Sequence, residues 1–326
     1  MFILYTMSDI EHCLGKLLTG TPPAAPIPKY DLMFNAPART HQRPLVLNDN
    51  LGIIVAAVIL DEDYRVVLIQ EAKESCHGRW YLPAGRAEPN ETLQEAVKRE
   101  VIEETGLMFE PSSVVLVESN HLFGYWIRFT FIGHITGGRL KTLNEADKES
   151  LQARWFSVPD IKTEVGIRLR AHDIVILIQS AISYLQRDPL HRHAALLPIH
   201  NAHKQMCIRA MVVKRDQAEF YVLLCMEDKP HFPIVKGTSI AEEALRTIDK
   251  EIFTASTGCF LRGLLCIEHM GRPHGSADGV CLNLLAVTDF QRELKNPNYI
   301  WHHIANPELK TVLRSKIPSQ HCLKCP

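Results

Sequence analysis

The chain has 326 residues, which is enough for two domains of ordinary size. Hydrophobic residues make up 46% and charged residues 22% of it, as in a typical globular protein. The formal net charge at pH 7 is -1, so no charge excess favours nucleic acid or a membrane surface as a partner. The N-terminal apolar run lacks a basic flank and a cleavage site, so we expect neither a signal peptide nor a membrane span. Nine cysteines without disulfide spacing indicate a reducing compartment, the cytoplasm, with the nucleus as the alternative.

The first fifty residues carry little pattern. Residues 1–20 predict one short helix, from Asp9 to Leu18. Residues 21–50 are proline-rich and lack a period, which is typical of a linker. We therefore interpret 1–50 as an N-terminal arm and linker.

Residues 51–188 predict one α/β domain. The continuous apolar run at 52–60 predicts a buried strand, and 65–70 returns as a second strand. A glutamate-rich helix is expected over 91–104. Further elements follow in chain order: strands at 113–119 and 125–135, a short strand and a turn at 153–161, and an amphipathic helix at 171–185. Strands interleaved with helices predict a layered α/β fold.

Three acidic side chains gather on the glutamate-rich helix. Glu100, Glu103 and Glu104 are related by steps of three and four residues, so they share a face and repel one another. A solvated acidic face is one interpretation. A divalent cation is the other, because magnesium takes a few carboxylates together with substrate phosphates.

The residues around this cluster favour the cation. Gly85 and Gly106 bracket the segment at positions suited to tight turns. Glu91 lies near the start of the helix, where a carboxylate is favourable. Arg99 stands beside the cluster and can hold Glu91 or another carboxylate in orientation.

The whole segment resembles the box of the Nudix family, G-x5-E-x7-R-E-U-x-E-E-x-G-U with U apolar. Every specified position is met, by Gly85, Glu91, Arg99, Glu100, Val101, Glu103, Glu104, Gly106 and Leu107. The resemblance implies a Nudix α/β/α sandwich with a mixed sheet. It also implies hydrolysis of a nucleoside diphosphate linked to another moiety, with magnesium, or alternatively manganese, held by the three clustered glutamates.

The resemblance extends to further site residues. It implies one more acidic residue on a loop, for which we predict Glu149, six residues before Trp155, with Glu145 in reserve. We expect Glu149 or Glu103 to transfer a proton, and we also predict that Arg99 is a catalytic residue. Gly85 and Arg86 are predicted to contact substrate, although Arg86 is equally consistent with a surface arginine. Glu91 and Gly106 are predicted to shape the box.

Residues 52–185 resemble the MutT homologues that convert oxidised purine nucleoside diphosphates such as 8-oxo-dGDP to the monophosphate and phosphate. A small-molecule nucleotide is the expected partner, without nucleic acid or membrane, and the oligomeric state stays open. The alternatives are another Nudix substrate, such as ADP-ribose, a dinucleoside polyphosphate, coenzyme A or capped RNA, and a non-enzymatic binding module. Capped RNA is disfavoured because the chain has no basic tract. Base recognition is left unassigned among the aromatic candidates Trp80, Tyr81, Phe123, Tyr125 and Trp126.

Comparing the sequence with itself indicates a second domain at 208–315, a degenerate Nudix-like copy in which Glu100 and Glu104 correspond to Ile248 and Ile252. Only Glu251, opposite Glu103, keeps its carboxylate. We expect this copy to serve packing, dimerisation or the substrate mouth. An unrelated α/β domain is the alternative.

Two segments flank this second domain, and one loop lies inside it. Residues 189–207 are interpreted as a linker whose histidines are solvated, and 316–326 as a tail. The loop 268–279 contains two histidines and an aspartate, which its glycines and proline explain without a metal.

Overall fold

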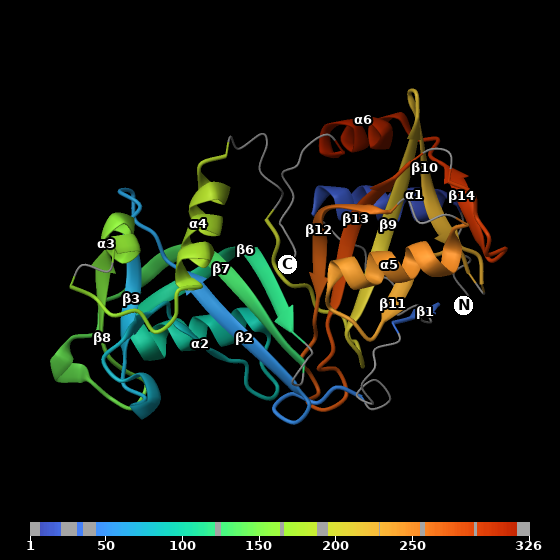
Figure 1. Cartoon of the computed structure of the whole chain (residues 1–326). Coiled ribbons are helices and arrows are strands. Elements are labelled where there is room, and N and C mark those ends of the chain that lie inside the picture. The colour runs from blue at the N-terminus through green and yellow to red at the C-terminus, as the bar shows by residue number, and fades with distance from the viewer. Residues whose placement is uncertain are drawn as a thin grey trace. The chain divides into compact units, whose positions relative to one another are not determined.

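The computed structural model describes residues 7–20, 31–34, 44–120, 125–163, 166–187, 195–227, 229–254, 258–289 and 292–317. The chain forms two compact units (Figure 1). The box unit spans residues 50–197 and contains the glutamate-rich helix. The second unit combines residues 1–49 with 198–326. Within the described ranges, no helix has the length and apolar character needed to cross a membrane.

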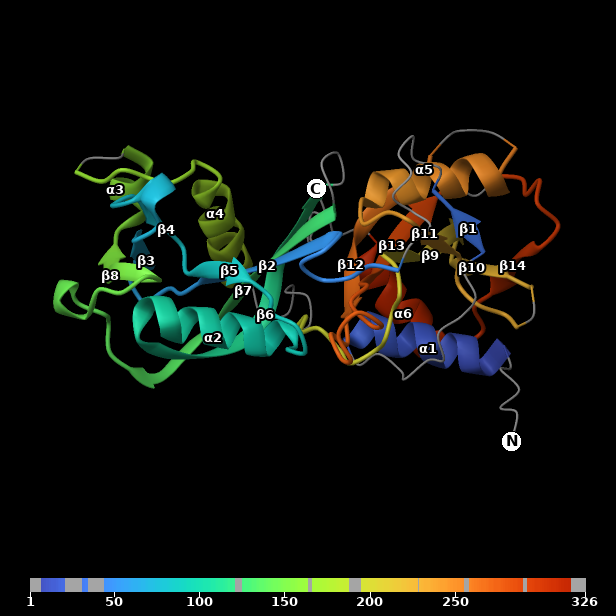
Figure 2. The ribbon, with the colours of Figure 1, turned by 90° about the horizontal axis from the view of Figure 1, so that it is seen from below.

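The box unit contains a four-stranded sheet of order β5-β2-β7-β6 and a three-stranded sheet of order β4-β3-β8. Its strands are β2 (Leu51–Val58), β3 (Val66–Glu71), β4 (Trp80–Tyr81), β5 (Ala84–Arg86), β6 (Leu107–Asn120), β7 (Tyr125–Gly138) and β8 (Ser150–Phe156). Its helices are α2 (Leu93–Thr105), α3 (Val158–Thr163) and α4 (Ile174–Leu185), with short 3-10 turns η2 (Glu74–Cys76) and η3 (Leu143–Glu145). β2 and β7 run parallel while the other paired strands run antiparallel, so the sheet is mixed, as predicted. Helices α2 and α4 lie on opposite sides of the larger sheet (Figure 2).

Local chemistry explains why α2 begins and ends where it does. Thr92 and Glu95 form a reciprocal capping box that satisfies free N–H groups at the start of the helix. Gly106 ends it with a φ of 76°, a left-handed conformation that glycine adopts without strain. The predicted apolar stripe is fully buried against the sheet: Leu93, Ala96, Val97 and Val101. Burial of this stripe fixes the face that the glutamates occupy.

The second unit is built on a seven-stranded sheet. Its strands are β1 (Leu32–Met33), β9 (Cys207–Asp216), β10 (Glu219–Cys225), β11 (Ile234–Lys236), β12 (Phe260–Glu268), β13 (Cys281–Thr288) and β14 (Tyr299–His303). Its helices are α1 (Met7–Thr19), α5 (Ala241–Ile252) and α6 (Pro307–Lys316). Helix α5 lies on one face of the sheet, and α1 and α6 lie on the other (Figure 2).

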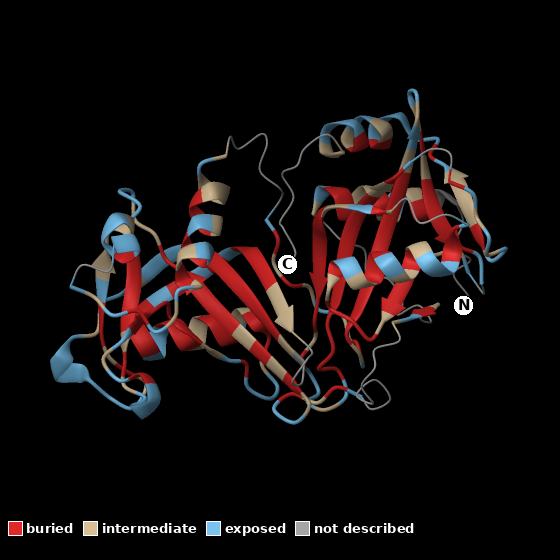
Figure 3. Cartoon of the chain, viewed as in Figure 1, coloured by how far each residue is buried: buried red, intermediate tan, exposed pale blue. Residues whose placement is uncertain are grey.

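The two units share four strand pairings. In the box unit β2 pairs parallel with β7 and antiparallel with β5, and in the second unit β9 pairs parallel with β13 and antiparallel with β11. The antiparallel pairs β6–β7 and β3–β8 likewise have counterparts in β12–β13 and β10–β14. The central strands of both units are almost entirely buried (Figure 3).

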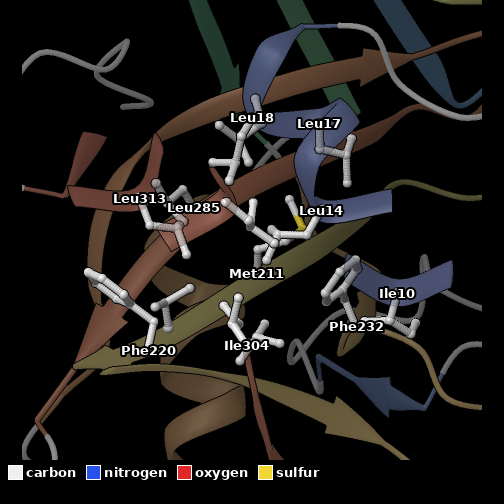
Figure 4. Packing of buried hydrophobic residues seen from close by; sticks show 14 of the residues in the cluster. Ile10, Leu14, Leu17, Leu18, Met211, Phe220, Phe232, Leu285, Ile304 and Leu313 are labelled. Atoms are coloured by element: carbon white, nitrogen blue, oxygen red, sulfur yellow. The ribbon is translucent and has the colours of Figure 1, made fainter. Parts of the chain in front are cut away.

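The N-terminal residues differ from the expected arm. Helix α1 begins and ends slightly outside the predicted bounds, and its apolar side chains Leu14 and Leu18 belong to the same buried cluster as Met211 and Leu285 (Figure 4). Strand β1 extends the same sheet by pairing parallel with β11. The described parts of 1–49 therefore belong to the second unit, with α1 covering the sheet and β1 extending it. The amphipathic helix buries its apolar face in this way.

The expected linker 189–207 also differs in its described part, residues 195–207. Leu196 is buried and exchanges hydrogen bonds with Ser113 and Val114 of the box unit. His203 is only 2% exposed and belongs to the second unit. The expectation of solvated histidines is therefore wrong for His203. Polar composition suggested solvent exposure here, and the partners that bury this histidine lie far away in the sequence.

Candidate active site

Two box glutamates are buried against strand β5. Glu100 is 7% exposed and Glu104 is 1% exposed. The backbone N–H of Ala84 donates a 2.8 Å hydrogen bond to Glu104 Oε2. The Glu100 carboxylate fills the space beside Gly85, where a Cβ would come within 2.1 Å of it. A glycine is therefore required at position 85 for the two carboxylates to sit together.

Burial makes the charged form of both carboxylates costly. Burial raises the pKa of Glu104 to about 8, against the hydrogen bond from Ala84, and repulsion by Glu100 adds to the rise. Burial also raises the pKa of Glu100, although Arg99 opposes the change. Buried carboxylates normally have a partner that offsets their desolvation. The donor set, hard oxygens on a helix facing a backbone turn, fits a hard divalent cation.

Glu103 lies at the rim of the site, with a side chain that is 42% exposed. Its Oε2 is 3.2 Å from an Arg99 guanidinium nitrogen that also lies 2.8 Å from Glu100 Oε1. The three predicted ligands therefore divide into two buried carboxylates and one exposed carboxylate. The exposed group is the one that bulk solvent reaches.

Arg99 connects the parts of the box. It contacts both oxygens of Glu91, at 2.7 and 3.1 Å, and donates to the backbone carbonyl of Arg86 at 2.9 Å. Its contacts with Glu100 and Glu103 come from the same guanidinium. Five fixed donors in a planar fork suit this bridging geometry. The arrangement makes Arg99 a positioning residue for the box carboxylates.

The loop before β8 is fastened to the end of α2. Lys141 donates to the Glu103 carbonyl at 2.8 Å, and the Ser150 hydroxyl donates to the Glu104 carbonyl at 2.6 Å. Glu149 directly precedes Ser150, and its side chain is 31% exposed. Within the described residues, the one ion pair of Glu149 is with Lys148 at 3.4 Å. The loop thus brings Glu149 to the C-terminal end of the box helix, and its catalytic role stays a prediction.

Glu145 is already engaged elsewhere. Its carboxylate pairs with Arg139 and accepts a hydrogen bond from the Thr142 backbone at 3.0 Å. Arg139 and then Thr142 hold its pKa at about 2. A carboxylate this acidic is a poor proton acceptor near neutral pH. These contacts favour Glu149 over Glu145 as the loop acid.

Three charged residues near the site were not predicted from the sequence. Glu71, at the end of β3, is 1% exposed, and its negative charge helps to raise the pKa of Glu104. Arg170 pairs with Glu71 at 2.6 Å. Lys73 is exposed, and its positive charge lowers the pKa of both Glu100 and Glu104. The one local sequence pattern that could have indicated any of the three is the acidic residue Glu71 directly after the apolar run 66–70.

A polar cluster continues from Arg170, whose guanidinium lies 5.1 Å from the centroid of the Tyr81 ring. The Tyr81 hydroxyl donates to Asp173 Oδ2 at 2.8 Å, and Arg128 donates to the same oxygen at 2.8 Å. Glu118 binds the other side of Arg128 at 2.8 Å. The second oxygen of Asp173, Oδ1, is buried and has no hydrogen-bond partner among the described residues. These groups form the Tyr81–Arg128–Asp173 cluster.

The remaining candidates differ in their surroundings, and Trp126 is half-buried. Arg86 is exposed, and its backbone carbonyl serves Arg99. Trp80 is buried and makes an edge-to-face contact with Phe156 at 4.6 Å, as a core residue does. Phe123 lies outside the described residues, as does the side chain of Tyr125.

Comparison with known proteins decides the family. The NUDIX domain matches residues 50–175. The human 8-oxo-dGDP phosphatase NUDT18 is 36% identical over 299 residues, which cover 87% of this chain and 89% of that protein. The chain belongs to the Nudix hydrolase family. The glutamate-rich helix is therefore the helix of a Nudix box, and the expected resemblance is confirmed.

Two further similarities describe the range of relatives. The zebrafish 8-oxo-dGDP phosphatase NUDT18 is 34% identical and covers 95% of each chain. The ADP-ribose pyrophosphatase of Methanocaldococcus jannaschii is 36% identical over 106 residues, covering 32% of this chain and 60% of that one. Among solved structures, a NUDIX hydrolase from Nitrosomonas europaea is 28% identical with a TM-score of 0.36, covering 43% of this chain and 93% of that one. The similarity to NUDT18 thus includes the second unit as well as the Nudix domain.

Proposed function

We propose that this Nudix hydrolase converts oxidised purine nucleoside diphosphates of the 8-oxo-dGDP type to the monophosphate and phosphate, with magnesium as cofactor. The observation that carries the proposal is a complete Nudix box with its two glutamates buried against β5, in a chain similar to NUDT18 over most of its length. The buried pair supports the chemistry at phosphorus. The long similarity supports the substrate class.

Glu100 and Glu104 are the residues that would hold the cation, with Glu103 at the rim. When bound, magnesium neutralises phosphate charge and activates a water for attack. Manganese, which also prefers oxygen ligands, is the expected substitute. Arg99 keeps the carboxylates in position through its contacts with Glu91 and the Arg86 carbonyl.

The chain's own groups supply the remaining catalysis. Glu149 is the proposed proton acceptor for the attacking water, since it is adjacent to the end of the box helix and free of the arginine contact that acidifies Glu145. Lys73 is an exposed cation whose charge acts on both carboxylates, and Arg86 is an exposed cation next to Gly85 in the chain. Both are suited to substrate phosphate oxygens. We propose that the nucleoside end extends toward the Tyr81–Arg128–Asp173 cluster, because Arg170 contacts both Glu71 and Tyr81.

Another Nudix substrate, such as ADP-ribose, is the competing function, since the box residues contact only phosphates and metal. A panel of 8-oxo-dGDP, dGDP, 8-oxo-dGTP and ADP-ribose, assayed for phosphate, pyrophosphate or AMP release, separates the candidates. Preference for 8-oxo-dGDP over dGDP supports the proposal. Turnover of ADP-ribose alone would transfer the assignment to an ADP-ribose pyrophosphatase.

We propose that the second unit is a degenerate, non-catalytic copy of the Nudix domain. Helices α2 and α5 begin at Leu93 and Ala241, and this alignment puts Ile248 and Ile252 opposite Glu100 and Glu104. Both isoleucines are 0% exposed, so apolar side chains fill the positions of the two buried carboxylates. The shared order and pairing of strands supports the same origin. We expect no phosphate chemistry from this unit.

A further inference from the structure

A buried cluster of nitrogen and sulfur donors lies in the second unit, at the ends where β9 and β13 begin. Cys207 and Cys281 are the first residues of these two parallel strands and are direct register partners. They are 1% and 0% exposed. His203, four residues before Cys207, has its Nδ1 3.8 Å from Cys207 Sγ. The donor atoms of all three side chains lie within 4.8 Å of one another.

We propose that His203, Cys207 and Cys281 bind a zinc ion. Zinc prefers thiolate and imidazole donors at about 2.3 and 2.0–2.1 Å, which puts a tetrahedral nitrogen–sulfur pair about 3.5 Å apart. The observed 3.8 Å between His203 Nδ1 and Cys207 Sγ needs little adjustment. Soft donors of this kind distinguish the site from the carboxylates of the Nudix box, which suit magnesium.

A hydrogen bond to Glu268 sets the orientation of the His203 ring. Its other nitrogen, Nε2, lies 2.8 Å from Glu268 Oε2. Glu268 also accepts hydrogen bonds from Asn201, Arg209 and Asn283, so its carboxylate is an acceptor toward every neighbour. His203 therefore donates from Nε2, which leaves the Nδ1 lone pair facing Cys207. A carboxylate behind a ligating histidine is the usual arrangement in zinc sites.

The backbone brings the histidine segment against the start of β13. The His203 carbonyl accepts the N–H of Gly279 at 2.9 Å, and Cys207 N–H donates to the carbonyl of Val280 at 2.9 Å. A Cβ on Gly279 would lie 2.4 Å from the carbonyl oxygen of Gln205, so this close approach requires the glycine. The ligands are thus held by the packed backbone rather than by a loose loop.

Charge balance also favours a divalent cation. Arg209 and Glu268 form a buried ion pair that is neutral by itself. Two thiolates and one Zn2+ ion add no net charge to it, so the filled site is electrically neutral within the core.

The site lies on the sheet face away from α5. Alternate residues of β9 share a face, so Cys207 and Arg209 point to the same side as Met211, which packs with α1. Helix α5, the counterpart of the Nudix helix, covers the other face (Figure 2). The zinc would therefore fasten residues 203–207 to the strand ends and would not take the place of the Nudix magnesium.

The test uses the full chain purified under reducing conditions with excess magnesium. Metal analysis should give about one zinc ion per chain, and the zinc should be lost in the Cys207→Ser, Cys281→Ser and His203→Gln variants. Cys259→Ser, at a buried cysteine outside the cluster, should keep it. Glu104→Gln should also keep it, which separates this site from the box carboxylates. Zinc lost only in Glu104→Gln would overturn the proposal.

A measurement on the wild-type protein tests the proposal even where the variants fail to fold. Cobalt added after removal of zinc should give a sulfur-to-cobalt charge-transfer band, and the metal should protect two thiols from alkylation. Absence of that band would contradict the site. A Cys207–Cys281 disulfide found by peptide mapping of the metal-free native chain would contradict it as well.

Discussion

The Ala84 backbone N–H lies 2.8 Å from Glu104 Oε2, and this hydrogen bond joins strand β5 to the last turn of the box helix. Among the residues that the structure describes, it is the one neutral donor to this carboxylate, which is 1% exposed. A single neutral hydrogen bond does not offset the desolvation of a buried charge. The pH behaviour of the metal-free protein follows from this imbalance.

The first prediction concerns stability and pH. Burial raises the pKa of Glu104 to about 8 in the folded chain, against 4.5 for an ordinary glutamate. Between pH 4.5 and 8 the folded state therefore keeps a proton that the unfolded chain releases. Binding of this proton adds to the unfolding free energy by about 1.4 kcal/mol per unit of pKa difference, and this stabilisation is lost as the pH rises from 4.5 to 8. We expect the Tm in EDTA to fall across this range, and magnesium to raise Tm more at pH 8 than at pH 6. Glu104→Gln should reduce both effects, and an unchanged pH dependence in that variant would contradict the burial argument.

The second prediction concerns Gly85. In Gly85→Ala the added Cβ meets the Glu100 carboxylate at 2.1 Å, so Glu100 must move. A displacement of about 1 Å in a catalytic group costs on the order of 100-fold in rate. Gly137→Ala is the matched control, because its Cβ meets only the flexible Met108 side chain at 3.2 Å. Equal activity of both variants, measured as kcat/KM with saturating magnesium, would show that the close approach does not matter.

The third prediction concerns Arg99 as a positioning residue. Arg99→Lys keeps the charge but loses the bridge among Glu91, Glu100 and the Arg86 carbonyl. We expect magnesium affinity to weaken about 10- to 100-fold, as for other groups that orient metal ligands, with part of kcat restored at high magnesium. Titration of activity against magnesium checks this. A lower kcat with unchanged magnesium affinity would instead give Arg99 a direct catalytic role.

The fourth prediction compares two loop acids. Glu149→Gln should lower kcat by about 10²- to 10⁴-fold, the usual contribution of a general base, with the fold unchanged. Glu145→Gln removes the pair with Arg139 and should leave kcat almost unaffected. The reverse order of effects would move the proton acceptor to Glu145.

The fifth prediction tests the degenerate copy. Glu251 is the α5 counterpart of Glu103, and it is exposed beside Lys250. Glu251→Gln should leave kcat/KM unchanged, while Glu103→Gln lowers it. A comparable loss in both variants would mean that the second unit takes part in catalysis.

The Nudix box could be predicted because its information is local. Gly85, Arg99 and the clustered glutamates stand at fixed spacing within one loop and one helix, and that spacing sets which side chains meet. Helix periodicity likewise predicted the buried stripe of α2 within two residues of its ends.

What the sequence did not show depends on contacts across long separations. Glu71 and Arg170 meet through a 2.6 Å ion pair between residues 99 positions apart. His203 is buried and contacts Glu268, 65 positions away. Its neighbours in the chain are polar, so the local sequence predicted that the histidine would be exposed to solvent. Helix α1 packs on strands that begin almost two hundred residues later, at Cys207, and the proline-rich sequence after the helix gave no sign of this contact.

The most direct test of the proposed function is phosphate release from 8-oxo-dGDP with magnesium, by the wild type and by Glu104→Gln. The side-chain amide oxygen in Glu104→Gln can still accept the Ala84 hydrogen bond, so the fold should persist while the buried charge is gone. Glu110→Gln, at an exposed glutamate paired with Lys98, is the control. We expect activity in the wild type and the control and background release in Glu104→Gln. Full activity in Glu104→Gln, or none in the wild type, would contradict the assignment.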